Sequence, residues 1–399
     1  MRNDGIEESV RAMLRARYPA VGIHDVRVHQ TASPGDGIAS TANRVVLEVD
    51  YDEGSEAGLP SRMMLKTIFL HRGLRFGLPA IQATGAVLRG LEALPWGSRM
   101  RPWVFSAIAS YRKRYPHAPD AMYRNEARFY RELRDELILE TPETFGCVID
   151  DERRSFAVLL EDLTLRNARF PNAREATTVD EVRQLLGTLA SLHAFHWGSA
   201  RFDVDLRWVA TPVSGGMFPV FRALGLDLIR NQVETYPYKQ LAIAPLGKRV
   251  DELWAALWKA QEILASGPQT LLHGDPHIGN TYLLPNGQGG LLDWQLMVRG
   301  RWAHDVTYLM ITGLETEERR AHERELLAFY LESLRAHGVA SPPDVDEAWL
   351  RYRQAAIWGL VIGWLITPTE NYGEAITQAN LERLVAAVQD LETLRALTD

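Results

Sequence analysis

Three polar side chains near the middle of the chain have the types and the spacing that phosphoryl transfer requires. Asp275 follows a short apolar run and lies in a turn, and Asn280 comes five residues later. Asp293 follows a second apolar run further along the chain. An amide oxygen and a carboxylate can share a hard cation such as Mg²⁺, and a further carboxylate can accept the proton of a hydroxyl. The three residues therefore predict phosphoryl-transfer chemistry.

A β-hairpin is predicted to bring these side chains together. Thr270 to Leu272 predicts a strand before the turn, and Thr281 to Leu284 predicts another after it. If Asn286 and Gly287 form a two-residue turn, Asn280 faces Asp293 across the hairpin, and opposed side chains lie about 5 Å apart. A longer loop would slide this pairing by a residue or two. An ordinary hairpin with a polar turn is the alternative interpretation.

The motif His273-Gly-Asp275-x-x-x-x-Asn280, with Asp293-Trp294 downstream, resembles a known catalytic loop and metal-binding aspartate. They are those of the aminoglycoside phosphotransferase and choline kinase superfamily, small-molecule kinases with a protein-kinase-like fold. Protein kinases share the spacing but have His-Arg-Asp and Asp-Phe-Gly, so the departures point away from protein substrates. The resemblance implies that Asp275 is catalytic and that Asn280 and Asp293 hold Mg²⁺ on ATP, with GTP not excluded.

Lys66 is the candidate for stabilising phosphate charge. It lies within Arg62 to Leu70, a predicted strand that is apolar on both faces, and only five of the 44 basic residues are lysines. A buried lysine needs a charged partner. Glu126 lies on the apolar stripe of a predicted helix, Tyr123 to Leu137. In the resembled family such a lysine binds the α- and β-phosphates and pairs with a helix glutamate. A surface glutamate paired with nearby arginines is the alternative.

A glycine-containing tip is predicted between two strands with alternating apolar residues. It spans residues 33–40 and contains Gly35, Gly37 and Ser40. The resemblance implies that backbone N–H groups of this tip cover the nucleotide phosphates, because glycine permits close approach. The spacing lacks a third glycine, so an ordinary hairpin loop is an equally good interpretation.

The predicted elements indicate an α+β protein with two lobes. The N-lobe, residues 1–162, holds a small antiparallel sheet with helices, including a first helix predicted as a lid or an edge, and an insertion at about residues 71–120. This insertion resembles the ecdysteroid-kinase-like (CHK kinase-like) branch more than the aminoglycoside branch. The resemblance implies that adenine binds at a hinge from Glu161 to Leu163 through backbone groups. A plain linker is the alternative.

The C-lobe, residues 163–399, is predicted to be mainly helical. Thr178 and Glu181 form a capping box before a helix that carries His193 and His196, both predicted as hydrogen-bonded core residues. Asp305 resembles a downstream aspartate of the family that braces the catalytic loop. Further helices are predicted at Arg249 to Ser266, Glu315 to His337, Val345 to Ile366 and Gly373 to Leu397.

Composition restricts the partners and the location. The chain has 399 residues, 46% of them hydrophobic, and a net charge of −7, which argues against nucleic acid as a partner. The single cysteine, Cys147, excludes an internal disulfide. The longest apolar run, Ala355 to Thr367, is too short to span a bilayer. We therefore expect a cytoplasmic protein with no membrane, nucleic-acid or obligate protein partner.

The function predicted from the sequence is ATP-dependent phosphorylation of a hydroxyl group on a small molecule. A nucleotide-binding pseudokinase that regulates a partner is a second hypothesis, which the incomplete glycine tip favours and Asp275 opposes. A metal-dependent hydrolase is a third, with His273 and His277 as zinc ligands. Pro276 argues against it, because proline breaks the strand that would align these ligands.

The last third of the chain suggests the character of the acceptor. Its aromatic residues are predicted to form the acceptor's walls, and no acid occurs from Gly359 to Ile366. A polycationic aminoglycoside would require clustered carboxylates, whereas aromatic walls suit an apolar or mixed-polarity alcohol. The alternative is that these aromatics are core. They are Trp302, Trp349, Trp358, Trp364 and Tyr372.

Overall fold

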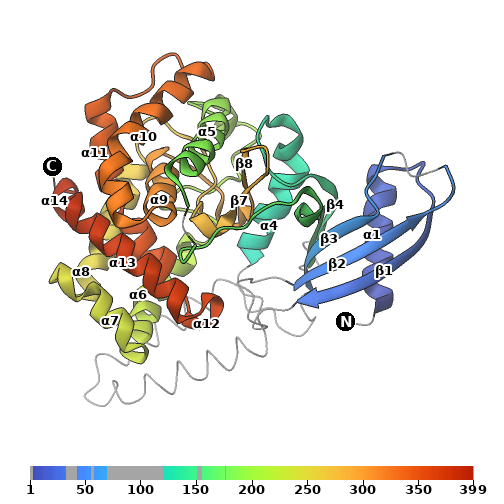
Figure 1. Cartoon of the computed structure of the whole chain (residues 1–399), viewed down its shortest axis with the longest axis horizontal. Coiled ribbons are helices and arrows are strands. Elements are labelled where there is room, and N and C mark those ends of the chain that lie inside the picture. The colour runs from blue at the N-terminus through green and yellow to red at the C-terminus, as the bar shows by residue number, and fades with distance from the viewer. Residues whose placement is uncertain are drawn as a thin grey trace.

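The computed structural model describes residues 3–32, 43–54, 58–69, 120–150, 155–175 and 177–398. The predicted glycine tip, with Gly35, Gly37 and Ser40, lies outside the described residues, as does almost all of the predicted insertion at 71–120. Within the described residues, an antiparallel sheet forms one end of the molecule and helices form the other (Figure 1). The α+β class predicted from the sequence is confirmed.

The sheet has five antiparallel strands in the order β1-β2-β3-β5-β4. Lys66 lies on the central strand, where it pairs with Arg44 on one side and Val158 on the other. Side chains alternate across a strand, so Leu65 packs into the core on one face while Lys66 faces the helical part. The strands are β1 (Ile23–Ala32), β2 (Asn43–Tyr51), β3 (Arg62–Phe69), β4 (Thr144–Asp150) and β5 (Ser155–Glu161).

Helix α1 (Asn3–Arg17) covers the face of the sheet that turns away from Lys66. Its stripe of Ile6, Val10, Met13 and Leu14 is buried in one cluster with apolar residues of the strands. The helix is therefore a layer of the core, and the prediction that it is a lid or an edge is wrong. An amphipathic helix gains most by burying its apolar stripe against a sheet face that would otherwise meet water.

Helix α4 (Asp120–Arg128) connects the sheet to the helical part (Figure 1). The helix predicted from Tyr123 to Leu137 is present but not uniform. It widens into a π-helical turn at Phe129–Leu133 and tightens into a 3-10 turn at Arg134–Glu136. Irregular turns of this kind often accompany functional sites, and this one follows Glu126 by a single turn.

The helical part contains the predicted helices and others that the sequence did not indicate. The capping box of Thr178 and Glu181 is present at the start of α5. The helix predicted from Val345 to Ile366 ends at Ala355 and resumes as a π-helix at Gly359–Leu365. A Cβ on Gly359 or Gly363 would collide with the ring of Tyr308, so the glycines let this segment pack closely.

The helices of this part begin after the sheet and run to the end of the described chain. None of the described helices has the length and apolar character needed to cross a membrane. They are α5 (Val179–Phe195), α6 (Phe218–Thr235), α7 (Pro237–Ile243), α8 (Val250–Leu264), α9 (Ala303–Gly313), α10 (Thr316–Ala336), α11 (Val345–Ala355), α12 (Thr369–Tyr372), α13 (Glu374–Asp390) and α14 (Thr393–Ala396).

Four short strands frame the predicted catalytic loop. β6 (Thr270–Leu272) pairs with β9 (Val298–Gly300), and β7 (Thr281–Leu283) pairs with β8 (Gly289–Leu291). The loop with Asp275 and Asn280 connects β6 to β7. The segment that begins with Asp293 connects β8 to β9, so the two segments lie between the same two pairs of strands.

Candidate active site

Gly274 gives the catalytic loop its sharp turn after β6. Its φ of 84° lies in the left-handed region, and a Cβ at this position would collide with the carbonyl oxygen of Leu296. Only glycine meets both conditions without strain. The turn delivers Asp275 between the two pairs of short strands.

Asp305 holds the backbone of this turn through its side-chain carboxylate. Its carboxylate accepts hydrogen bonds from the backbone N–H groups of His273 (2.6 Å) and Gly274 (3.0 Å). His193 Nε2 lies 3.1 Å from the same carboxylate, and His193 Nδ1 lies 2.7 Å from the Tyr330 hydroxyl. Burial alone would raise the pKa of Asp305, but the contact with His193 holds it below its usual range. His193 is thus the hydrogen-bonded core residue that the sequence predicted.

His196, the other histidine of α5, is buried but differs from His193. Neither ring nitrogen has a hydrogen-bond partner within the described part of the chain, so the prediction of a hydrogen-bonded residue is wrong for His196. Burial lowers its pKa to about 4, which keeps the ring neutral. The His196 ring packs edge-on against the ring of Phe195.

Asp275 is bound by Asn280 from its own loop. The side-chain amide of Asn280 donates to the Asp275 backbone carbonyl (2.9 Å) and to its carboxylate (3.2 Å). Burial raises the pKa of the Asp275 carboxyl well above its usual value, and the negative charges of Asp293 and Asp305 raise it further. A carboxylate with a raised pKa is a stronger base, which suits proton transfer near neutral pH.

The hairpin register differs by one residue from the prediction. Thr281 pairs with Leu291, and the N–H of Leu292 donates to the carbonyl of Asn280, so Asn280 is opposite Leu292 and not Asp293. The loop contains three residues, because Leu284 and Gln288 are hydrogen-bonded around it. Gly287, with φ 86°, supplies the left-handed residue that a three-residue loop requires. Asp293 therefore lies one residue beyond Leu292, the residue that is opposite Asn280.

Asp293 has a backbone conformation that turns its side chain toward the sheet. Its φ of 70° is one of three positive values among the described non-glycine residues. The carboxylate lies 3.2 Å from Lys66 Nζ. Burial alone would raise the pKa of Asp293, but the positive charges of Lys66 and Arg44 together lower it, so the side chain is ionised at neutral pH.

The predicted contact between Lys66 and Glu126 is present. Lys66 Nζ lies 2.8 Å from one carboxylate oxygen of Glu126 and 2.9 Å from the other, and both side chains are buried. Lys66 thus lies between the carboxylates of Glu126 on α4 and Asp293 on the helical part. Three residues far apart in sequence form one ionic cluster, in which Lys66 and Glu126 are buried and Asp293 is half-buried.

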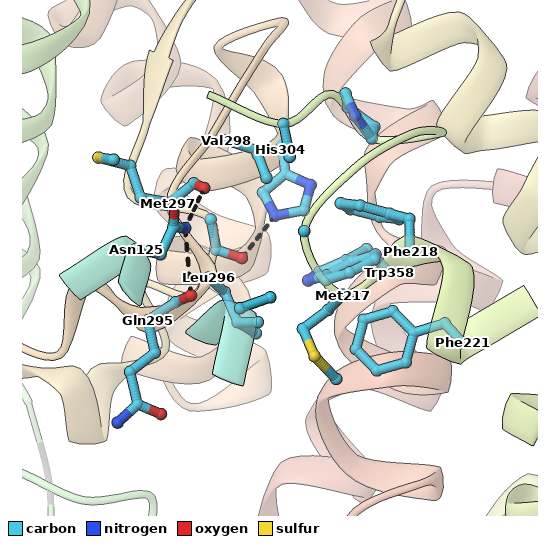
Figure 2. A pocket seen from close by; sticks show the side chains of 15 residues that line it. Asn125, Met217, Phe218, Phe221, Gln295, Leu296, Met297, Val298, His304 and Trp358 are labelled. Carbon is cyan, nitrogen blue, oxygen red and sulfur yellow. Dashed lines mark hydrogen bonds between the residues drawn. The ribbon is translucent and has the colours of Figure 1, made fainter. Parts of the chain in front are cut away.

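Helix α4 is fastened to the segment that follows Asp293. Asn125 donates from its side-chain amide to the carbonyls of Gln295 (3.2 Å) and Met297 (2.6 Å), as Figure 2 shows. On the same helix, the Phe129 ring stacks on Trp294, with ring centroids 3.6 Å apart. The sequence analysis did not identify Asn125. Its position next to Glu126 on a helix with few other polar amides was the available signal.

The donor atoms near Asn280 and Asp293 fit a magnesium ion. Asn280 uses its amide nitrogen on Asp275, and its oxygen accepts no hydrogen bond from the described residues. Asp293 adds an ionised carboxylate. Amide and carboxylate oxygens are hard donors, which Mg²⁺ prefers.

The two histidines of the loop have structural partners instead of a metal. His273 Nε2 donates to the Leu292 carbonyl at 3.0 Å, while its Nδ1 accepts from the Asp275 N–H. His277 Nδ1 accepts from the Gly279 N–H. In the described part of the chain, no group of three or more His, Cys, Asp or Glu side chains could hold a metal ion. The geometry thus gives the hydrolase hypothesis no zinc ligands.

The predicted hinge follows β5 directly. The N–H of Glu161 donates to the Glu143 carbonyl at 2.9 Å, so this group completes the sheet. Leu163 begins a 3-10 turn, and its side chain is buried against Tyr282 and Leu284. Adenine binding at Glu161 and Leu163 remains a prediction.

The aromatic residues of the last third fall into two groups. Trp302 is buried and stacks on Tyr330, whereas Trp349 is half-buried and stacks on Tyr352; neither lines the pocket beside Gly274. The other group lies near the catalytic loop. Trp364 and Tyr372 pack against His277, and Trp358 lines a pocket beside Gly274.

Comparison with known proteins gives a family and several structural matches. The model of the phosphotransferase enzyme family matches residues 110–358, more than half of the chain. A type I macrolide 2′-phosphotransferase is 15% identical, with 98% of this chain and 97% of that chain covered and a TM-score of 0.42.

Two further solved structures are similar over nearly their whole length. A spectinomycin phosphotransferase solved with ADP and spectinomycin is 10% identical, with a coverage of 97% and 98% and a TM-score of 0.46. A choline kinase from Streptococcus pneumoniae is 11% identical, with a coverage of 97% and 99% and a TM-score of 0.42. No curated protein matches the sequence.

Proposed function

The chain belongs to the phosphotransferase enzyme family, and from that membership we propose that it transfers the γ-phosphoryl group of ATP to a hydroxyl group of a small molecule. The observation that carries the proposal is the buried ammonium of Lys66 between the carboxylates of Glu126 and Asp293. A buried cation with this support is suited to phosphate charge, because the low dielectric of the interior strengthens its attraction for anions.

Lys66 would contact the phosphates, with Glu126 as its positioning partner. Asn280 and Asp293 would hold Mg²⁺ through their oxygen atoms. Bound Mg²⁺ neutralises the charge that builds up on the phosphates during transfer. Because Asp293 touches both Lys66 and the metal position, it would set the distance between the two cations.

Asp275 would act on the acceptor. Its carboxylate, with its pKa raised by burial, would orient the hydroxyl and receive its proton. As the bond between the acceptor oxygen and the γ-phosphorus forms, the bond between that phosphorus and the β-phosphate oxygen breaks, and ADP is the leaving group. The proton then passes from Asp275 to solvent.

The test is the dependence of phosphoryl transfer on Asp275. Asp275→Asn keeps the hydrogen-bonding shape of the side chain but removes the base, so ATP binding is expected to persist while phosphorylation of an alcohol panel is lost. Binding is measured by calorimetry with Mg²⁺ and a non-hydrolysable ATP analogue, and transfer by ³¹P NMR of the product. Equal transfer by the wild type and the variant would refute the assignment. Binding without transfer in the wild type would favour the pseudokinase.

A further inference from the structure

A mainly apolar pocket lies beside the catalytic loop, with walls from parts of the chain that are distant in sequence (Figure 2). Met217, Phe218 and Phe221 form one wall at the start of α6, and Leu296 lies opposite on the segment after Asp293. Gly274, the residue before Asp275, also lines the pocket. A molecule in this pocket would therefore lie next to the loop that carries the proposed base.

The pocket contains no formal charge from the described residues. Its lining has no aspartate, glutamate, lysine or arginine, and His304 is its only titratable side chain. Burial lowers the pKa of His304 from its usual value, so the ring is neutral at physiological pH. A cation placed there would lose its hydration without gaining a counter-ion, which is strongly unfavourable.

His304 presents an unpaired hydrogen-bond acceptor. Its Nε2 lies 2.9 Å from the carbonyl oxygen of Gly274, and because a carbonyl can only accept, Nε2 carries the hydrogen. Nδ1 of the neutral ring is then a bare acceptor. This atom has no partner within the described part of the chain, although the side chain is only 2% exposed.

Trp358 presents an unpaired donor beside it. Its indole N–H has no hydrogen-bond partner among the described residues, and the side chain is 3% exposed. The rings of Trp358 and His304 have centroids 4.8 Å apart, and Figure 2 shows them side by side on the pocket wall. Buried polar atoms are nearly always paired in proteins, and these two belong to neighbouring rings that line the same pocket, so a ligand in this pocket is the group that could pair them.

We infer that the acceptor is a neutral, mainly apolar alcohol with a second hydroxyl group, and that this second hydroxyl binds between His304 and Trp358. This inference rests on the proposed function. A hydroxyl both donates and accepts, so one such group could pair with His304 Nδ1 as a donor and with the Trp358 N–H as an acceptor. The apolar body then contacts Phe218, Phe221 and Leu296, while the reacting hydroxyl extends past Gly274 toward Asp275.

Three six-membered-ring alcohols test the inference because they differ in one substituent. They are 1,4-cyclohexanediol, cyclohexanol and trans-4-aminocyclohexanol, which have a second hydroxyl, no second group and an ammonium group. We expect the wild-type protein with Mg²⁺ and an ATP analogue to bind the diol best and the amino alcohol least, by roughly 10-fold or more. Binding is measured by saturation-transfer NMR titration. Tightest binding of the amino alcohol, or no binding of either neutral alcohol, overturns the inference.

Trp358→Phe removes the N–H donor and keeps an aromatic ring. The diol is expected to lose roughly 3- to 10-fold in affinity, as for one neutral hydrogen bond, whereas cyclohexanol is not. Trp349→Phe is the matched control, because Trp349 stacks on Tyr352 away from the pocket. Equal losses for the diol and cyclohexanol, or no loss for either, would also overturn the inference, and analogue binding by the variant shows that it is folded.

Turnover separates failure of this inference from failure of the proposed function. If the wild type phosphorylates the amino alcohol but neither neutral alcohol, and Asp275→Asn loses this activity, the inference is overturned and the proposed function stands. Phosphorylation of any of the three alcohols that persists in Asp275→Asn would refute the proposed function itself.

Discussion

The two sides of the catalytic loop use polar groups in opposite ways. On the side facing the sheet, the ammonium of Lys66 lies 2.8 Å from the carboxylate of Glu126 and 3.2 Å from that of Asp293. On the side facing α6, His304 and Trp358 are neutral, and each has a polar atom with no hydrogen-bond partner among the described residues. Apart from the half-buried Asp293, the residues on both sides are buried, so the difference lies mainly in charge and in pairing.

This difference indicates what each side can bind. A buried cluster in which one cation lies between two carboxylates can exchange a partner for a phosphate or a metal ion. A neutral pair without partners attracts an uncharged hydrogen-bonding group and rejects an ion. A loop with both surroundings is suited to joining a polyanion to a neutral molecule.

The largest expected effect comes from Asp275, which lies between the two sides. Asp275→Asn should reduce phosphorylation of an accepted alcohol by roughly 10²- to 10⁴-fold, the usual contribution of a general base. The measurement is initial-rate kinetics at saturating ATP. Asp203→Asn, at a side chain that is 88% exposed, is the control. A loss of less than a few fold would show that Asp275 is not the general base.

The same variant is expected to change stability with a defined pH dependence. Because the folded protein raises the pKa of Asp275, the wild type loses stability as the pH rises from the unfolded pKa, near 4, through the folded value. Asp275→Asn lacks this loss. Its melting temperature should therefore exceed that of the wild type at pH 7, and the gap should close at pH 4. A gap that is constant with pH would contradict the raised pKa.

The next largest effect is expected from removing the positive charge of Lys66, which lies between Glu126 and Asp293. Lys66→Met leaves the buried carboxylate of Glu126 and the half-buried one of Asp293 without this cation, which should lower the free energy of unfolding by about 3 to 5 kcal/mol. Adding Glu126→Gln should restore part of this loss, because one of the two charges is removed. Urea unfolding of the two single variants and the double variant measures the coupling.

An ion pair on the surface of the sheet provides the control for this double-mutant cycle of Lys66 and Glu126. Arg27 and Asp50 are 51% and 37% exposed, and their coupling should be no more than about 1 kcal/mol. Equal coupling in the two cycles would mean that burial does not distinguish the Lys66 cluster from an ordinary ion pair.

A fourth prediction concerns Lys239, a buried lysine whose ammonium group donates to backbone carbonyls. Its Nζ donates to the carbonyls of Trp364, Leu365 and Thr367 at the end of the π-helix, and burial lowers its pKa to about 8. The unfolded chain then binds more protons than the folded one above pH 8. Relative to Lys239→Met, the wild type should gain about 1 to 3 kcal/mol of stability between pH 8 and 10.5.

Urea unfolding at several pH values checks this gain. Lys248→Met, at a lysine that is 42% exposed and paired with Glu252, is the control and should show no such change. Parallel stability curves for the wild type and Lys239→Met would show that the lysine keeps its ordinary pKa when buried.

The smallest expected effect comes from adding a charge to the neutral side. Leu296→Asp places a carboxylate on the wall of the pocket, at a half-buried position that tolerates a polar side chain. The preference for 1,4-cyclohexanediol over trans-4-aminocyclohexanol should shift toward the amino alcohol by about 10-fold. Leu241→Asp, at a leucine that is 72% exposed on α7, should leave the preference unchanged. An unchanged preference in Leu296→Asp would place the acceptor elsewhere.

The charged side could be predicted from the sequence, whereas the neutral side could not. Lys66 was identifiable because a lysine within an apolar strand needs a partner, and Glu126 because it interrupts an apolar stripe. The register near Asn280 failed by one residue, since two- and three-residue loops differ only in how Gly287 is used. Sequence periodicity does not determine that choice.

The pocket could not be predicted from the sequence for a different physical reason. Its walls come from segments that meet only through tertiary packing, and α9, which carries His304, is buried along its whole length. A helix buried on every side has no polar face, so it lacks the amphipathic pattern by which helices are recognised. Trp358 was identified as a possible wall residue, but nothing in the sequence paired it with His304.

The attachment of α4 through Asn125 has a mechanical consequence. Asn125 and Phe129 fasten the helix to the segment after Asp293, whereas Lys66 belongs to the sheet. A tilt of the sheet against the helical part would therefore change the separation of Lys66 and Glu126, because these contacts hold α4 to the helical part. The Lys66–Glu126 contact thus reports the alignment of the two parts.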